Sequence, residues 1–157
     1  MSRLFYTTLA VVPADVRDQI GLGYLFARAA DTIADTDLID RSRRLDFLSQ
    51  LKAQFVSEQI SWSQIRDIQQ AMGPLQQDSS ERVLLERLED CFRLFQECSP
   101  EDRRRVQRLM TTLTQGMEMD LSRFPGQSVE DLVALKTIDD LDRYTYYVAG
   151  CVGEFWT

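Results

Sequence analysis

Residues 24–35 read YLFARAADTIAD, and this stretch places polar side chains at helical intervals in an otherwise apolar segment. These side chains belong to Tyr24, Arg28, Asp31 and Asp35. Their spacing of four, three and four residues puts them within roughly 60° of arc on one face of an α-helix. The apolar residues between them indicate that the rest of the helix packs against neighbouring helices. The segment therefore predicts a core helix that carries one polar stripe.

The two aspartates of this stripe stand one helical turn apart. Unpaired carboxylates on a largely buried helix are costly, so Asp31 and Asp35 need a neighbouring cation or water. In this arrangement they can share Mg²⁺, which keeps waters or phosphate oxygens in its remaining positions, while Arg28 holds another oxygen of the same diphosphate. The competing interpretation is a solvated helix end, in which Asp35 and Asp37 lead into a loop.

The rest of the chain also has helical periodicity. Four residues have the character of N-caps, each with an acidic or amide residue three positions later: Ser61, Ser99, Ser128 and Thr137. We expect helices at 13–36, 40–58, 61–72, 79–97, 100–122, 129–135 and 138–157, with turns at 73–74 and 124–126. No stretch alternates in the manner of a strand, so the expected fold class is all-α, in one domain over 1–157.

Composition excludes several classes of function. The chain has 157 residues, 44% of them apolar, which is enough for one domain with a real core. Its net charge of −7 opposes nucleic acid as a partner. There is no histidine, which removes His-based triads and the usual mixed zinc sites. An anionic substrate would have to be neutralised by arginines or by a cation held between carboxylates.

The cysteines and the termini bear on location. Cys91, Cys98 and Cys151 form no C-x-x-C pair, and their odd number favours small core residues in a reducing cytoplasm over reactive thiols. The N-terminal apolar run is too short for a signal peptide or membrane span, so we expect at most peripheral membrane contact. The helical pattern still runs at the C-terminus without a C-cap, which favours a fragment of a longer protein.

Two further patterns carry polar groups on helices. Residues 142–153 read DRYTYYVAGCVG, in which Ala149 and Gly153 form a small-x-x-x-small packing face. The opposite side would then line a cavity or simply pack in the core; it carries Tyr144, Val148, Cys151 and Phe155. Residues 116–120 read GMEMD, with Gly116 and Asp120 one turn apart, which alone indicates little.

Three segments together resemble the squalene/phytoene synthase family: SRLF at 2–5, the stretch 24–35, and YTYYVAGCVG at 144–153. The second is similar to the family's first aspartate-rich motif, and the third to its Y-x-x-Y-V-A-G-x-V-G motif. Their order and spacing cover almost the whole chain. The resemblance implies the N-terminal half of an isoprenoid-synthase-type helical bundle around a central cavity.

The resemblance also implies roles for individual residues. Asp31 and Asp35 would bind Mg²⁺, with Arg28 and Tyr24 beside them. Ser2 and Arg3 fall where the family contacts diphosphate, and Arg3 and Arg28 would also meet NADPH phosphates. Tyr144 matches a tyrosine that assists the first half-reaction, with Tyr24 as a second catalytic candidate. Residues 116–120 resemble a helix segment that lines the substrate cavity.

The implied activity is head-to-head condensation of two farnesyl diphosphates, through presqualene diphosphate, to squalene with NADPH. Phytoene, dehydrosqualene or presqualene diphosphate are alternative products within the family. A non-catalytic helical interaction module is an alternative of a different class. A four-helix metal carboxylate protein is not favoured, because this chain has no Glu-x-x-His pair to supply the metal ligands.

The chain departs from the family pattern at three points. Leu4 stands at a common serine position and Ala34 at the position of a frequent third acid. The second aspartate-rich motif is missing from the chain. We therefore expect this chain by itself to be inactive.

Overall fold

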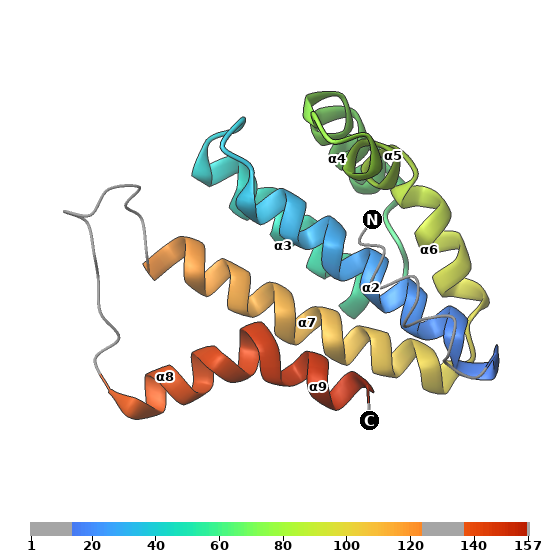
Figure 1. The fold of residues 1–157 in the computed structure, drawn as a ribbon. Coiled ribbons are helices and arrows are strands. Elements are labelled where there is room, and N and C mark those ends of the chain that lie inside the picture. Colours follow the sequence, from blue (N-terminus) through green and yellow to red (C-terminus); the bar gives the residue numbers. More distant parts are fainter. Residues whose placement is uncertain (1–13, 124–136, 157) are drawn as a thin grey trace.

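The computed structural model describes residues 14–123 and 137–156, and all regular structure within them is helical (Figure 1). This confirms the all-α prediction. The expected helix at 129–135, the Ser128 cap and the turn at 124–126 lie outside the described residues, as does the 2–5 segment.

The first three helices match their expected ranges closely. They are α2 (Ala14–Asp35), α3 (Arg41–Val56) and α4 (Trp62–Met72). Asp40 caps α3 by accepting a hydrogen bond from the backbone N–H of Arg43 at 3.0 Å. Ser61 stands at the N-cap position of α4, but its hydroxyl makes no capping bond there.

The prediction of one continuous helix at 79–97 is wrong, because this range forms two helices. After the 3₁₀ turn η1 (Gly73–Leu75), the chain forms α5 (Ser79–Glu86) and α6 (Leu88–Glu97), with Arg87 between them outside helical geometry. Both helices contact α2 and α4, and α5 also contacts η1. The apolar pattern runs through the junction without a glycine or proline to mark it.

The two remaining helical stretches form an antiparallel pair. In α7 (Pro100–Arg123), the Ser99 hydroxyl accepts a hydrogen bond from the N–H of Asp102 at 3.1 Å. The stretch predicted as one helix at 138–157 is α8 (Ile138–Thr145), a π-helical segment η3 (Tyr146–Gly150) and α9 (Cys151–Trp156). Thr137 caps α8 as expected. In Figure 1 this stretch is kinked and runs back along α7.

The core surrounds α2. The Phe26 ring, which is fully buried, lies 4.9 Å from the Phe55 ring and 4.7 Å from the Phe92 ring, centroid to centroid. These aromatic contacts join α2 to α3 and α6, while α7 packs along α2 and α3. Packing on these sides leaves the polar stripe on an open side of α2.

The end of α2 that carries the aspartates is tied to two other helices. Arg44 at the start of α3 donates from Nη1 to the carbonyl of Ala34 at 3.0 Å, which occupies one of the last free carbonyls of α2. Arg41 donates from Nη2 to the carbonyl of Ser122 at 3.1 Å. The C-terminal ends of α2 and α7 therefore lie at the same end of the bundle, where α8 also begins.

Candidate functional site

The polar stripe of α2 faces open space. Tyr24, Arg28 and Asp31 line a pocket of about 340 Å³ whose other wall is the N-terminal part of α5. Arg28, Asp31 and Asp35 line an adjoining pocket of about 420 Å³. The opposite side of α2 is buried and includes Phe26. The structure thus brings the four predicted residues of the stripe to one continuous surface.

Arg28 is the central cation of this surface. Its Nη1 lies 3.6 Å from Asp31 Oδ2, and its Nη2 donates to Glu81 Oε1 on α5. The side chains of Arg28 and Asp31 remain 43% and 45% exposed, so both can still reach a ligand.

Sequence reasoning missed Glu81, which lines both pockets. The available signal was Asp78 three positions earlier, but that pattern marks a helix start and indicates no site. Asp78 does cap α5, accepting from the N–H groups of Ser80 and Glu81 at 2.8 and 3.0 Å. The cap fixes the first turn of α5 and so places Glu81 opposite Arg28.

Negative charge predominates around Asp31. Burial raises the pKa of this carboxyl, and the charges of Asp35 and Glu81 raise it further, against the lowering effect of Arg28. A bound cation would relieve this repulsion. Among the described residues, no group of three or more acidic, histidine or cysteine side chains is arranged to hold a metal by itself. Two carboxylates nevertheless fit Mg²⁺, which commonly takes one or two protein carboxylates and fills its other positions with water and phosphate oxygens.

Tyr144 lines neither of these pockets. Its hydroxyl donates a hydrogen bond to Asp120 Oδ1 at 3.0 Å, so α8 is joined to the C-terminal part of α7. Burial raises the pKa of Tyr144, as do the hydrogen bond to Asp120 and the charge of that carboxylate. The phenol is therefore protonated at neutral pH and acts as a donor. Residues 116–120 meet the tyrosine motif directly, because a Cβ at Gly116 would lie 2.8 Å from Tyr147 Cβ.

The packing face predicted for Ala149 and Gly153 is wrong. Ala149 is exposed, and a Cβ added at Gly153 would meet nothing within 4 Å. The buried residue is Cys151, on the side that was expected either to line a cavity or to pack in the core. Close approach instead depends on glycines of the partner helices, since a Cβ at Gly23 of α2 would lie 2.7 Å from the Phe155 ring. The π-helical segment changes the register of this stretch, which a uniform helical pattern does not anticipate.

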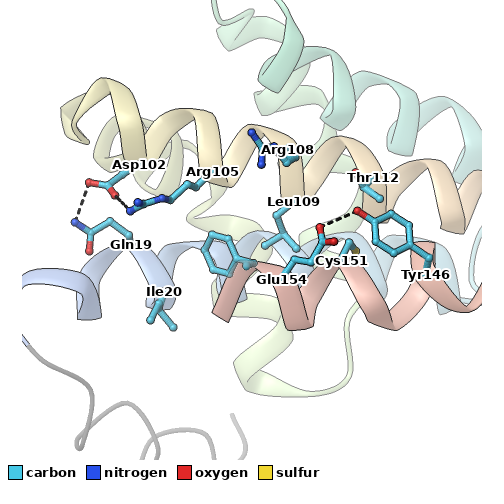
Figure 2. Close-up of a pocket in the computed structure, with 11 residues that line it drawn as sticks. Gln19, Ile20, Asp102, Arg105, Arg108, Leu109, Thr112, Tyr146, Cys151 and Glu154 are labelled. Atoms are coloured by element: carbon cyan, nitrogen blue, oxygen red, sulfur yellow. Dashed lines mark hydrogen bonds and ion pairs between the residues drawn. The ribbon is translucent and has the colours of Figure 1, made fainter. Parts of the chain in front are cut away.

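Figure 2 shows a further pocket, of about 450 Å³, between α2, α7 and α9. Several of its polar groups are paired with one another. Gln19 donates to Asp102 at 3.1 Å, Arg105 also contacts Asp102 at 3.3 Å, and the Tyr146 hydroxyl donates to Glu154 at 2.8 Å. None of the predicted site residues within the described ranges lines it. Ser2 and Arg3, the other predicted diphosphate contacts, lie outside the described residues.

The prediction that the cysteines are core residues is confirmed for Cys91 and Cys151. All three cysteines are free thiols, with Cys91 and Cys151 buried and Cys98 partly buried. Burial raises the pKa of Cys91 to about 11, which leaves it protonated at neutral pH.

A helical bundle whose central helix presents paired aspartates and an arginine to open pockets defines an all-α protein of the isoprenoid-synthase type. The chain belongs to the squalene/phytoene synthase family, which matches it over residues 1–157. No solved structure matches it.

Its curated relatives include three squalene synthases from distant organisms. They are those of Saccharomyces cerevisiae, 26% identical over 153 residues, Botryococcus braunii, 28% over 154 residues, and Nicotiana benthamiana, 26% over 153 residues. Each alignment covers 98% of this chain, but only 31%, 29% and 32% of the respective relative. The chain therefore spans about a third of the length of these relatives.

Proposed function

We propose that this chain supplies one wall of the active site of an enzyme that joins two farnesyl diphosphates head to head, through presqualene diphosphate, to squalene. The observation that carries the proposal is the placement of Arg28 between two carboxylates on a surface shared with Asp35. The names of the relatives support squalene as the product.

Asp31 and Asp35 are the proposed Mg²⁺ ligands. When bound, Mg²⁺ would neutralise the diphosphate leaving group and so favour formation of an allylic cation. Arg28 donates hydrogen bonds to the diphosphate oxygens, and Ser2 and Arg3 add further contacts. Leu25 and Leu84 line the same pocket and provide apolar surface that limits the access of water.

Tyr144 and Tyr24 are the proposed catalytic side chains. Tyr24 lines the pocket beside Arg28, where its ring face can stabilise developing positive charge. Tyr144 holds its proton on the phenolic oxygen, so it can deliver or relay a proton during the first half-reaction. Residues 116–120 form the supporting wall behind it. NADPH is the proposed hydride donor for the second half-reaction, with its phosphates near Arg3 and Arg28.

The enzyme is proposed to work in the cytoplasm, with peripheral membrane contact for release of a lipid product. In residues 14–123 and 137–156, no helix is both long and apolar enough to cross a bilayer.

Product analysis of the full-length protein tests the proposal. Incubation with farnesyl diphosphate and Mg²⁺, with and without NADPH, is expected to give squalene only when NADPH is present. Asp31→Asn and Asp35→Asn are expected to abolish turnover. Asp46→Asn is a matched control, because it removes an exposed carboxylate that lines neither pocket of the stripe.

The other outcomes separate the alternatives. Phytoene, dehydrosqualene or presqualene diphosphate as the end product would replace squalene synthesis with another activity of the family. The absence of both turnover and Mg²⁺-dependent binding of farnesyl diphosphate would favour a non-catalytic helical module.

A further inference from the structure

Helix α8 carries Tyr144 but buries none of its own residues. Its apolar side chains Ile138 and Leu141 are 76% and 51% exposed, so hydrophobic burial does not fix its orientation. Polar contacts join it to α7 instead. The Tyr144 hydroxyl donates to Asp120 at 3.0 Å, and Arg123 Nη1 lies 3.8 Å from Asp140 Oδ1. The second contact is long and partly exposed, which makes it the weaker of the two.

Helix α7 holds the acceptor Asp120 close to a point where the tyrosine motif already contacts this helix. Asp120 follows Gly116 by one helical turn, and Gly116 is where Tyr147 makes its close approach to α7. Tyr144 and Tyr147 thus meet α7 at two points one turn apart. The Gly116 contact fixes the position of η3 along α7, and Asp120 then determines where the phenol one turn earlier points.

We propose that Asp120 is a positioning residue, which holds the Tyr144 hydroxyl in the direction and the protonated form that the reaction uses. The inference rests on the proposed function, in which Tyr144 acts on the substrate. The carboxylate accepts the phenolic proton in a hydrogen bond and leaves the lone pairs of the phenolic oxygen directed elsewhere.

The electrostatics agree with the geometry. Burial raises the pKa of Tyr144, and Asp120 raises it further through its hydrogen bond and its charge. Among the described residues, Arg123 from α7 and Asp140 from α8 also carry charge at this junction and lie near each other. Loss of the Asp120 charge is therefore expected to lower the pKa of Tyr144 and to bring phenolate formation to lower pH.

The test compares Asp120→Asn and Asp120→Ala in the full-length protein. The asparagine variant keeps an acceptor oxygen but loses the charge, whereas alanine loses both. Asp142→Asn is the matched control, because it removes an exposed carboxylate of α8 two residues from Tyr144. Two readouts are measured: steady-state kinetics against pH, and ultraviolet absorbance of phenolate against pH, with Tyr144→Phe used to assign the Tyr144 transition.

We expect Asp120→Ala to lower kcat roughly 10²-fold with little change in KM, since the substrate still binds while the hydroxyl is misplaced. Asp120→Asn should retain more turnover, and its alkaline limb and its Tyr144 phenolate transition should both move to lower pH. An unchanged phenolate transition in Asp120→Asn would overturn the inference, as would wild-type kcat in Asp120→Ala.

Failure of the proposed function has a different signature. If Tyr144→Phe keeps wild-type turnover while Asp120→Asn still shifts the phenolate transition, the positioning contact stands and the catalytic role of Tyr144 falls. If Asp120→Ala does not fold, the kinetics and the phenolate transition of Asp120→Asn decide, because its acceptor oxygen keeps the hydrogen bond from Tyr144 that joins α8 to α7.

Discussion

Arg28 is shared between carboxylates of two helices. Its guanidinium has five N–H donors, of which the contacts to Asp31 and Glu81 use a minority, so donors remain for diphosphate oxygens. These two carboxylates hold the guanidinium where it lines the pocket beside Tyr24. Both ion pairs are partly exposed to solvent, which makes their contribution to folding small.

Substitution of Arg28 should therefore separate binding from stability. Arg28→Ala is expected to weaken Mg²⁺-dependent binding of farnesyl diphosphate by about tenfold or more, the usual effect of losing a hydrogen bond between charged groups. The free energy of unfolding should change by less than about 1 kcal/mol. Arg28→Lys should recover only part of the affinity, because an ammonium lacks the planar fork of donors. Calorimetric titration and urea unfolding of the full-length protein measure the two effects.

Arg105→Ala provides the control for that comparison. Arg105 also pairs with two carboxylates, Glu101 and Asp102, but it lines the pocket of Figure 2 instead of the stripe. Equal loss of affinity in both variants would show a general effect of net charge, and would contradict a specific role for Arg28.

Cys91 and Cys98 should differ in reactivity towards alkylating reagents. Burial raises the pKa of Cys91 to about 11, so little thiolate exists at pH 8, and the buried sulfur is also shielded. We expect native protein to be alkylated at Cys98 before Cys91, and urea-unfolded protein to react at both. Mass spectrometry of alkylated peptides checks this order. Rapid alkylation of native Cys91 would show that α6 opens locally.

The raised pKa of Cys91 also determines how the free energy of unfolding changes with pH. A thiol pKa that is higher in the folded than in the unfolded state contributes stability that is complete below the unfolded value of about 8.5. That contribution is lost as pH rises through about 11.

At the scale of single elements, apolar periodicity and capping residues predicted where helices lie better than they predicted where a helix is broken. The boundaries of α2, α3 and α7 follow from apolar periodicity and from caps such as Ser99, which act within one turn. The break at Arg87 and the π-helical segment at 146–150 are not marked by a side-chain cap of this kind. Leu85 and Leu88 are both fully buried on either side of the break, so the apolar pattern stays continuous although the backbone does not.

The close approach of η3 to α7 yields a paired prediction. A methyl group at Gly116 would lie 2.8 Å from Tyr147 Cβ and 3.2 Å from its carbonyl carbon, so Gly116→Ala should destabilise the fold by about 1–3 kcal/mol through overpacking. Gly153→Ala meets no neighbour within 4 Å and should be neutral or stabilising by up to about 1 kcal/mol, because alanine favours helix. Urea unfolding of both variants measures the difference.

The decisive result is which of these two variants has the lower free energy of unfolding. If Gly153→Ala were the more damaging, the small-x-x-x-small face would be a packing surface in the full-length protein after all. If Gly116→Ala were neutral, η3 would not rest on α7.

At the scale of the whole molecule, some residues of the candidate site can be predicted from the sequence and others cannot. Spacing within α2 predicts the shared face of Tyr24, Arg28, Asp31 and Asp35, because a helix relates residues three and four apart. Glu81 and Asp120 could not be predicted in this way. They lie 53 and 24 residues from their partners Arg28 and Tyr144, and only the packing of α5 on α2 and the polar contacts of α8 with α7 bring them together.

The site depends on the core immediately beneath it. Phe26 is two residues from Arg28 on α2 and contacts the rings of Phe55, Phe92 and Phe95, so one side chain joins the stripe to α3 and α6. Phe26→Ala is expected to cost about 3–5 kcal/mol. That is a large share of the about 5–15 kcal/mol that stabilises a typical domain.

Phe26→Leu keeps most of the apolar volume and should cost distinctly less, which makes it the variant in which α2 remains folded. We expect it to retain Mg²⁺-dependent binding of farnesyl diphosphate, whereas Phe26→Ala should lose binding together with folded structure. Val56→Ala is the control, since Val56 is 63% exposed, lines neither pocket of the stripe, and its truncation should change stability by no more than about 0.5 kcal/mol. Circular dichroism during urea unfolding, with binding measured on the same samples, tests the link. If Phe26→Ala unfolded at the same urea concentration as Val56→Ala, α2 would not be the helix on which the bundle and its site are built.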